Sequence, residues 1–110
     1  MERRMEKLSS FLRREAAAYL ETVDIPLGTV CTVTNVVLSE DKKYANIFIS
    51  IFPALHIGSF LEKWKVWQRE FEYQMRKKIR MRIIPAIRFK LDDTELKRER
   101  IEKLLEDAKE

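Results

Sequence analysis

The sequence predicts an α+β fold, in which helices cover one face of a three-stranded sheet. Two segments rich in β-branched residues are separated by five polar residues, which is typical of an antiparallel hairpin. A long amphipathic helical pattern follows, and after a proline a third segment alternates apolar and charged residues. A chain of 110 residues with this composition is expected to form a single domain over residues 1–110.

The first half of the chain is expected to hold one helix and the hairpin. Residues 2–22 place apolar side chains at helical spacing, with arginines and lysines on the other faces. Residues 24–28 contain proline and glycine and indicate a loop. The two strands are residues 29–38 and 44–52, and the polar residues between them form the turn.

The longest helical pattern covers residues 57–82 and has two stripes. The apolar stripe is expected to face the sheet and comprises Ile57, Phe60, Leu61, Trp64, Trp67, Phe71, Met75 and Ile79. The second stripe is mostly basic and comprises Lys65, Arg69, Glu72, Arg76 and Arg80. Pro85 disfavours helical geometry at Ile84, so we expect the helix to end near there.

The remaining elements are a third strand and a C-terminal helix. Residues 86–91 alternate, with Arg88 and Lys90 on the face opposite the apolar side chains. Asp92 precedes Glu95 by three residues, as in a capping box. Apolar residues then recur at helical spacing, which predicts a last amphipathic helix over about residues 94–108.

Positive charge is concentrated in one segment. Residues 63–90 carry ten basic and two acidic side chains, a local net charge of +8, whereas residues 91–110 carry five basic and eight acidic ones. A solvated helix face usually mixes both signs, because i,i+4 pairs of opposite charge reduce repulsion. Concentrated positive charge attracts polyanions at long range. The charge therefore indicates an anionic partner.

Nucleic acid fits this charge best among the candidate partners. A membrane surface would take up the apolar stripe that the sheet needs as core, and no apolar run approaches the length of a membrane span. An acidic protein remains an alternative. Phosphates favour multiple lysine and arginine contacts through counterion release. Trp64, Trp67 and Tyr73 are candidates to stack on bases, although the position of both tryptophans on the apolar stripe favours core packing.

The sequence supports no catalytic or metal site, and we expect no cofactor. His56 is the single histidine and is expected to be a loop or cap residue. Cys31 lies in a strand pattern with no basic neighbour to activate it. Asp92 and Asp93 lack a third ligand at suitable spacing, so capping explains them better. The N-terminus has no apolar signal region, which predicts a cytoplasmic protein.

Four segments together resemble bacterial ribosome-binding factor A. Residues 32–52 (TVTNVVLSEDKKYANIFISIF) resemble the first hairpin of that family, and residues 80–91 (RMRIIPAIRFKL) resemble its basic helix end, proline break and third strand. Residues 92–106 (DDTELKRERIEKLLE) are similar to its C-terminal segment, and the N-terminal helix fits more loosely. The matches cover almost the whole chain in the right order.

The resemblance implies a KH-like fold related to type II KH domains, in the order α-β-β-α-β plus a C-terminal helix. It also implies a non-catalytic, monomeric assembly factor that binds the small (30S) ribosomal subunit and its 16S rRNA during late maturation and is then released. The family lacks the G-x-x-G phosphate clamp of ordinary KH domains. Its relatives carry an Ala-x-Gly helix kink, where this chain has Trp67-Gln68-Arg69. The helix therefore either runs straight here or bends for another reason.

The basic residues are the candidate RNA-binding site. Their expected role is phosphate contact without sequence preference. The principal candidates are Lys65, Arg69, Arg76, Lys77, Arg80 and Arg82, and the secondary candidates are Arg88, Lys90, Lys42, Lys43, Arg3 and Arg4. Two other functions stay open: a general basic RNA- or DNA-binding module, and an adaptor whose basic face docks an acidic protein.

Overall fold

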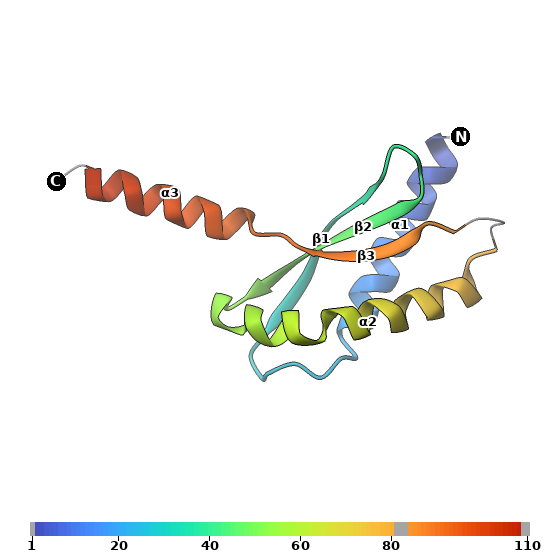
Figure 1. Cartoon of the computed structure of the whole chain (residues 1–110), viewed down its shortest axis with the longest axis horizontal. Helices are drawn as coiled ribbons and strands as arrows, with labels where there is room; N and C mark the ends of the chain where they lie inside the picture. The colour runs from blue at the N-terminus through green and yellow to red at the C-terminus, as the bar shows by residue number, and fades with distance from the viewer. Residues whose placement is uncertain (1, 81–83, 109–110) are drawn as a thin grey trace.

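The predicted α+β architecture and element order are confirmed by a computed structural model of the chain, which describes residues 2–80 and 84–108 (Figure 1). The elements are α1 (Glu2–Leu20), β1 (Val30–Leu38), β2 (Tyr44–Phe52), a 3-10 turn η1 (Ala54–His56), α2 (Ile57–Lys78), β3 (Ala86–Leu91) and α3 (Thr94–Ala108). None of the helices in these residues is both long and apolar enough to cross a membrane.

The three strands form one sheet in the order β1-β2-β3. β1 and β2 pair antiparallel through the short turn, and a bulge shifts the register between Val33 and Asn35. β3 pairs parallel to β2, with Phe48 opposite Lys90. A parallel pair requires a crossover connection, and α2 supplies it. The β-α-β unit therefore fixes α2 against the sheet.

The core lies on one face of the sheet, beneath α1 and α2. Alternate residues of the central strand β2 point to this face and are buried, namely Ala45, Ile47, Ile49 and Ile51. α1 contributes Leu12 and Tyr19, and the Phe71 ring of α2 lies between the rings of Tyr19 and Phe89, at centroid distances of 5.5 and 5.7 Å. These contacts join both helices to the sheet in one core.

The apolar stripe of α2 is buried as predicted, with one exception. Phe60, Trp67, Phe71 and Met75 are buried, and Trp64 packs partly against them, so core packing of the tryptophans is confirmed. The prediction for Leu61 was wrong, because its side chain remains 44% exposed. Leu61 lies one residue after Phe60, which is about 100° around the helix from the core direction.

α2 ends earlier than the pattern predicted. The helix stops at Lys78, and Ile79 already has extended geometry with φ −92° and ψ 119°. Arg80 therefore lies beyond the helix, and Arg82 falls outside the described residues. The chain must turn back toward the start of β3 within a few residues, so it leaves the helix before Pro85 forces it to.

α3 projects from the body and packs against none of it (Figure 1). None of its residues is buried, and Ile101, Leu104 and Leu105 are each more than half exposed. The molecule is consequently elongated, with extents of 59 × 32 × 18 Å. The opposite face of the sheet also has no helix over it among the described residues.

Candidate nucleic-acid interface

The outer side of α2 carries an exposed basic stripe, which we define as Lys65, Arg69 and Arg76. The three residues are spaced four and seven apart, so they lie on one side of the helix over roughly 16 Å. This side points away from the buried residues Phe60, Trp67 and Phe71. The helix therefore has the predicted apolar and basic sides over its whole length, from Ile57 to Lys78.

Two polar side chains of α2 fasten the basic stripe to β3. The Phe89 amide donates to Gln68 Oε1 at 2.7 Å, and the Ile87 amide donates to Glu72 Oε2 at 2.9 Å. Both amides belong to the outer edge of the sheet, where β3 has no neighbouring strand. An unpaired amide at such an edge is costly when it is buried. These bonds therefore hold the side of α2 at a fixed position along β3.

The same contacts explain the roles of Trp67, Gln68 and Arg69, which lie where the family that the sequence resembles is expected to have a helix kink. α2 runs through these residues as one helix of 22 residues, so of the two alternatives the uninterrupted one holds. Trp67 is buried against Phe60, with ring centroids 5.4 Å apart, and Gln68 bonds to β3. The tripeptide thus anchors a continuous helix, and its third residue, Arg69, points outward.

The last turn of α2 is basic, but each of its cations has a partner within the protein. Arg76 donates to Glu72 at 2.7 Å, Lys78 pairs with Glu15 of α1 at 3.2 Å, and the Lys77 ammonium lies 4.3 Å from the centre of the Tyr73 ring. Exposed pairs of this kind contribute roughly 0–1 kcal/mol, so a phosphate can compete for the cations. Lys65 and Arg69 have no ion pair among the described residues.

Arg88 and Lys90 lie on the other face of the sheet from α2. Both are exposed on β3, where they alternate with the buried residues Ile87 and Phe89. The Arg88 guanidinium lies 3.4 Å from the centre of the Tyr44 ring, a cation–π arrangement that helps to hold the guanidinium in place. The structure therefore does not bring these two residues onto the basic stripe of α2.

The hairpin turn and the start of α1 hold the remaining candidates. Lys42 and Lys43 are exposed in the turn, where the Ser39 hydroxyl and the Lys43 amide bond to Asp41 and hold the pKa of its carboxyl below its ordinary value. This turn lies beside the first turns of α1, which carry the exposed Arg3 and Arg4 (Figure 1). These four residues gather at one end of the molecule.

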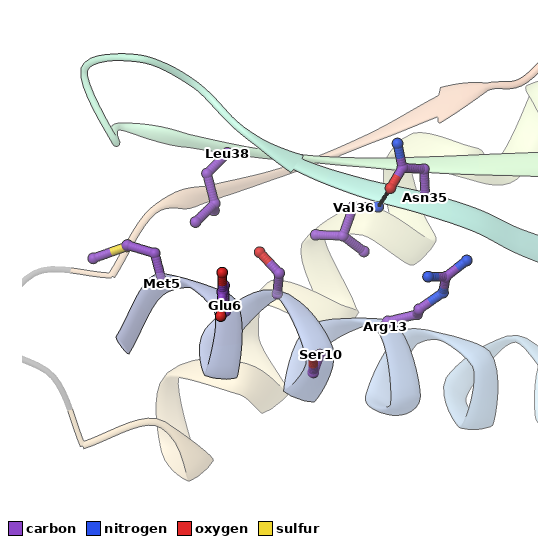
Figure 2. Close-up of a pocket in the computed structure, with 8 residues that line it drawn as sticks. Met5, Glu6, Ser10, Arg13, Asn35, Val36 and Leu38 are labelled. Atoms are coloured by element: carbon purple, nitrogen blue, oxygen red, sulfur yellow. Dashed lines mark hydrogen bonds between the residues drawn. The ribbon is translucent and has the colours of Figure 1, made fainter. Parts of the chain in front are cut away.

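A shallow groove of about 470 Å³ separates α1 from β1 (Figure 2). Met5, Val36 and Leu38 form its apolar side, and Arg13 closes one end by donating to the carbonyl oxygen of Thr34 at 2.7 Å. Arg13 was not among the predicted site residues, because nothing in its sequence spacing shows that it reaches the bulge in β1. It covers a backbone acceptor at the free edge of that strand.

The residues considered for catalysis have structural contacts instead. His56 occupies the N-cap position of α2 without a side-chain bond to the helix, and its ring instead shares a hydrogen bond with the Thr29 hydroxyl. Cys31 is half-buried, and burial raises the pKa of its thiol. Thr34 and Thr94 donate to Asp92 and hold the pKa of its carboxyl below the ordinary value. Asp92 also accepts from the Thr94 amide at the start of α3, so it does bond to the helix start. The predicted capping box with Glu95 was wrong, because the Asp92 amide donates to the Ile49 carbonyl oxygen of β2 and Glu95 pairs with Arg98.

Known proteins resemble this chain in sequence over most of its length. The family model described as ribosome-binding factor A matches residues 4–105. The chain is 32% identical over 109 residues to ribosome-binding factor A from Dictyoglomus thermophilum, covering 92% of this chain and 87% of that protein. The protein of the same name from Coprothermobacter proteolyticus is 29% identical over 105 residues, covering 94% and 77%.

Solved structures agree on the fold. The crystal structure of ribosome-binding factor A from Thermus thermophilus aligns with a TM-score of 0.63 at 23% identity, covering 78% of this chain and 92% of that one. A homology model of the Thermus thermophilus protein, fitted into a cryo-EM map of its complex with the 30S subunit, aligns with a TM-score of 0.56 at 20% identity, covering 76% and 90%. Because the family model matches residues 4–105 of the 110 residues in the chain, the chain belongs to the ribosome-binding factor A family.

Proposed function

We propose that the protein is a non-catalytic assembly factor, which binds the small (30S) ribosomal subunit through its 16S rRNA late in maturation and leaves when maturation is complete. The observation that carries this proposal is the basic stripe of α2, whose side chains are exposed on a helix fastened to the sheet. A Thermus relative has been placed in a complex with the 30S subunit, which supports a ribosomal partner for this chain.

The role we assign to Lys65, Arg69 and Arg76 is contact with rRNA phosphates. Two of the three have no ion pair among the described residues, so phosphate binding does not first require an internal pair to break. Each cation that binds a phosphate releases condensed counterions, which makes the binding favourable and dependent on salt. Lys77 and Arg80 add positive charge beyond the stripe, and Arg82 stays a candidate by its place in the sequence.

Phosphate contacts alone carry no sequence information. Selectivity for the small subunit therefore comes from the shape of the rRNA and from the fixed geometry of the surface that meets it. The bonds from Gln68 and Glu72 to β3 matter here, because they keep the basic stripe from shifting along the sheet. We place this binding in the cytoplasm and assign it to the monomer.

Sedimentation of the tagged protein through a sucrose gradient tests the proposal. We expect it with free or immature small subunits and absent from 70S particles. Replacing Lys65 and Arg69 together by Gln should move the protein to the top of the gradient. In the matched control, Arg100 and Lys103 of α3, both exposed, are replaced by Gln. This variant should sediment as the wild type does.

Two other results would overturn the proposal. A protein that stays at the top of the gradient yet binds unrelated RNA at low salt is a general RNA-binding module. A protein that binds no RNA even at low salt is an adaptor for an acidic protein. In both cases the basic stripe would have a use other than the small subunit.

A further inference from the structure

The open face of the sheet, opposite the core, carries aromatic and basic side chains in a regular arrangement. Tyr44, Phe48 and Phe52 of β2 alternate with the buried residues of that strand, so all three point to the open face. They are four residues apart, which spaces them by roughly 13 Å along the strand. Phe52 is 71% exposed, and the other two are half-buried among their neighbours.

The neighbouring strand places its cations beside these rings. In the register of the sheet, Lys90 lies directly opposite Phe48, and Arg88 lies opposite Asn46, between Tyr44 and Phe48. Both cations are exposed and have no ion pair among the described residues. The Arg88 guanidinium is held 3.4 Å from the centre of the Tyr44 ring. The Arg88 guanidinium is therefore in place beside a ring before any ligand binds, and Lys90 lies on the neighbouring strand opposite Phe48.

The apolar surface around these side chains is also uncovered. Val30 and Val37 of β1 flank the row of rings on its other side, and they are 55% and 43% exposed. Asp92 lies at the edge of this region and already accepts hydrogen bonds from Thr34 and Thr94. The carboxylate of Asp41 in the hairpin turn is near enough to Arg88 for their charges to interact, but the two form no ion pair. The open face therefore combines exposed π surfaces with positive charge that has no direct ion pair among the described residues.

We propose that this face binds an unpaired stretch of RNA, whose bases stack on Phe48, Phe52 and the Arg88–Tyr44 pair while its phosphates meet Lys90 and Arg88. Bases stack on aromatic rings and on arginine guanidinium planes whatever their identity, and cations beside the rings track the backbone. A duplex is excluded as the ligand, because its bases are stacked on each other and do not present their flat faces.

The proposal deepens the proposed function and rests on it for the source of the RNA, namely rRNA. It adds a surface on the opposite side of the sheet from the basic stripe of α2, so the two surfaces meet different stretches of nucleic acid. The protein would then lie between two RNA segments. The stripe on α2 contacts phosphates, and the open face takes up bases that have no pairing partner.

The test compares two probes that share a charged backbone and differ in their bases: a short oligouridylate and an abasic ribose-phosphate oligomer of the same length. We expect the wild type to bind the oligouridylate about ten-fold tighter or more, the contribution of at least one stacked base. Phe48→Leu keeps an apolar side chain in the strand but removes one of the stacking rings, and should reduce this difference several-fold. Arg88→Gln should weaken binding of both probes.

Tyr73→Leu is the matched control, since Tyr73 is an exposed ring on α2 and is 61% exposed. It should leave the preference for the oligouridylate unchanged. Amide chemical shifts of β2 and β3 followed by NMR establish that each variant is folded and report contact with the open face directly. Shifts on addition of the oligouridylate should centre on Phe48, Arg88 and Lys90.

Three results would overturn the proposal: equal affinity for both probes, shifts confined to α2, or a base preference lost in Tyr73→Leu and kept in Phe48→Leu. Equal affinity would assign the cations of this face to a partner without bases, such as an acidic protein segment. The oligonucleotide assay contains no ribosome, so a failure to sediment with small subunits would remove the proposed function without changing this result.

Discussion

α2 and α3 are both amphipathic helices by sequence, but only α2 buries its apolar side in the structure. α2 buries Phe60, Trp67, Phe71 and Met75 and bonds to β3 through Gln68 and Glu72. α3 has no buried residue, and Ile101, Leu104 and Leu105 face solvent. An apolar stripe therefore shows which side of a helix can be buried. Whether that side is buried depends on the topology, which places α2 against the sheet and leaves α3 with no surface to pack on.

The two helices also differ in what maintains them. An isolated helix of 15 residues is marginal in water, because most helical stability in proteins comes from packing. α3 has local support only: bonds to Asp92 at its start and exposed pairs of Lys97 with Asp93 and Arg98 with Glu95. α2, in contrast, is stabilised by packing against the hydrophobic core. Substitutions in the two helices should therefore have very different effects.

The largest expected contrast is in stability. Phe71→Ala removes a fully buried ring that contacts both α1 and β3, and should lower the free energy of unfolding by about 3–5 kcal/mol. Leu104→Ala, at a side chain that is 68% exposed, should change it by less than about 0.5 kcal/mol. Urea unfolding measures both. Similar losses in the two variants would mean that α3 packs on the body in solution.

The bonds between α2 and β3 should have the next largest effect. Glu72→Ala leaves the Ile87 amide without an acceptor at a part-buried position, which costs about 1–3 kcal/mol. Glu72→Gln keeps an acceptor oxygen at the same place and should cost clearly less, although it loses the pair with Arg76. Urea unfolding separates the two. Equal destabilisation would show that the ion pair matters and the bond to β3 does not.

A smaller change is expected in RNA affinity. Replacing Lys65 and Arg69 by Gln removes two phosphate contacts, which should make the dependence of log affinity on log salt shallower by roughly 1.5. The Arg100 and Lys103 variant of α3 carries the same change in net charge and should keep the slope of the wild type. The measurement is a salt titration of binding to 16S rRNA. Equally shallow slopes in the two variants would show that net charge alone governs binding, and a wild-type slope in the Lys65 and Arg69 variant would show that these residues do not contact phosphate.

The smallest effect concerns pH and α3. The folded pKa of Asp92 is lowered by its bonds to Thr34 and Thr94, so the stabilisation that it gives is complete above the ordinary pKa of about 4 and is lost as the pH falls through the lower folded value. Asp92→Ala should remove this dependence and fray the start of α3, at a typical cost of about 1 kcal/mol for a lost cap.

Far-UV circular dichroism between neutral pH and pH 3 follows this loss of helix. Asp107→Ala, near the other end of α3, is the control and should keep the acid transition of the wild type. An Asp92 variant with an unchanged transition would mean that other carboxyls govern the start of α3.

Periodicity in the sequence was enough to predict the elements, since the buried residues of β2 and most of those of α2 follow alternation and helical spacing. It was not enough to place the end of α2, because the extended geometry at Ile79 follows from the return path to β3. The bonds of Gln68 and Glu72 were also beyond it. They depend on where α2 lies along the edge of β3, and no local sequence pattern determines that position.

The site was predictable to a similar degree. Lys65, Arg69 and Arg76 share one side of α2 because helical spacing requires it, and their exposure follows from the buried opposite side. The separation of Arg88 and Lys90 from that stripe follows from the parallel crossover, which puts α2 on one face of the sheet and leaves these side chains on the other. Charge counted along the chain does not distinguish the two faces.

Photo-cross-linking to immature small subunits tests most directly the claim that the outer side of α2 meets rRNA. Tyr73 and Leu104 are both exposed, at 61% and 68%, and each is replaced by benzoylphenylalanine in turn. Tyr73 lies beside Arg69 and Arg76 on the helix. The account predicts that position 73 cross-links to 16S rRNA and that position 104 does not. Cross-links to rRNA from position 104 alone would contradict it.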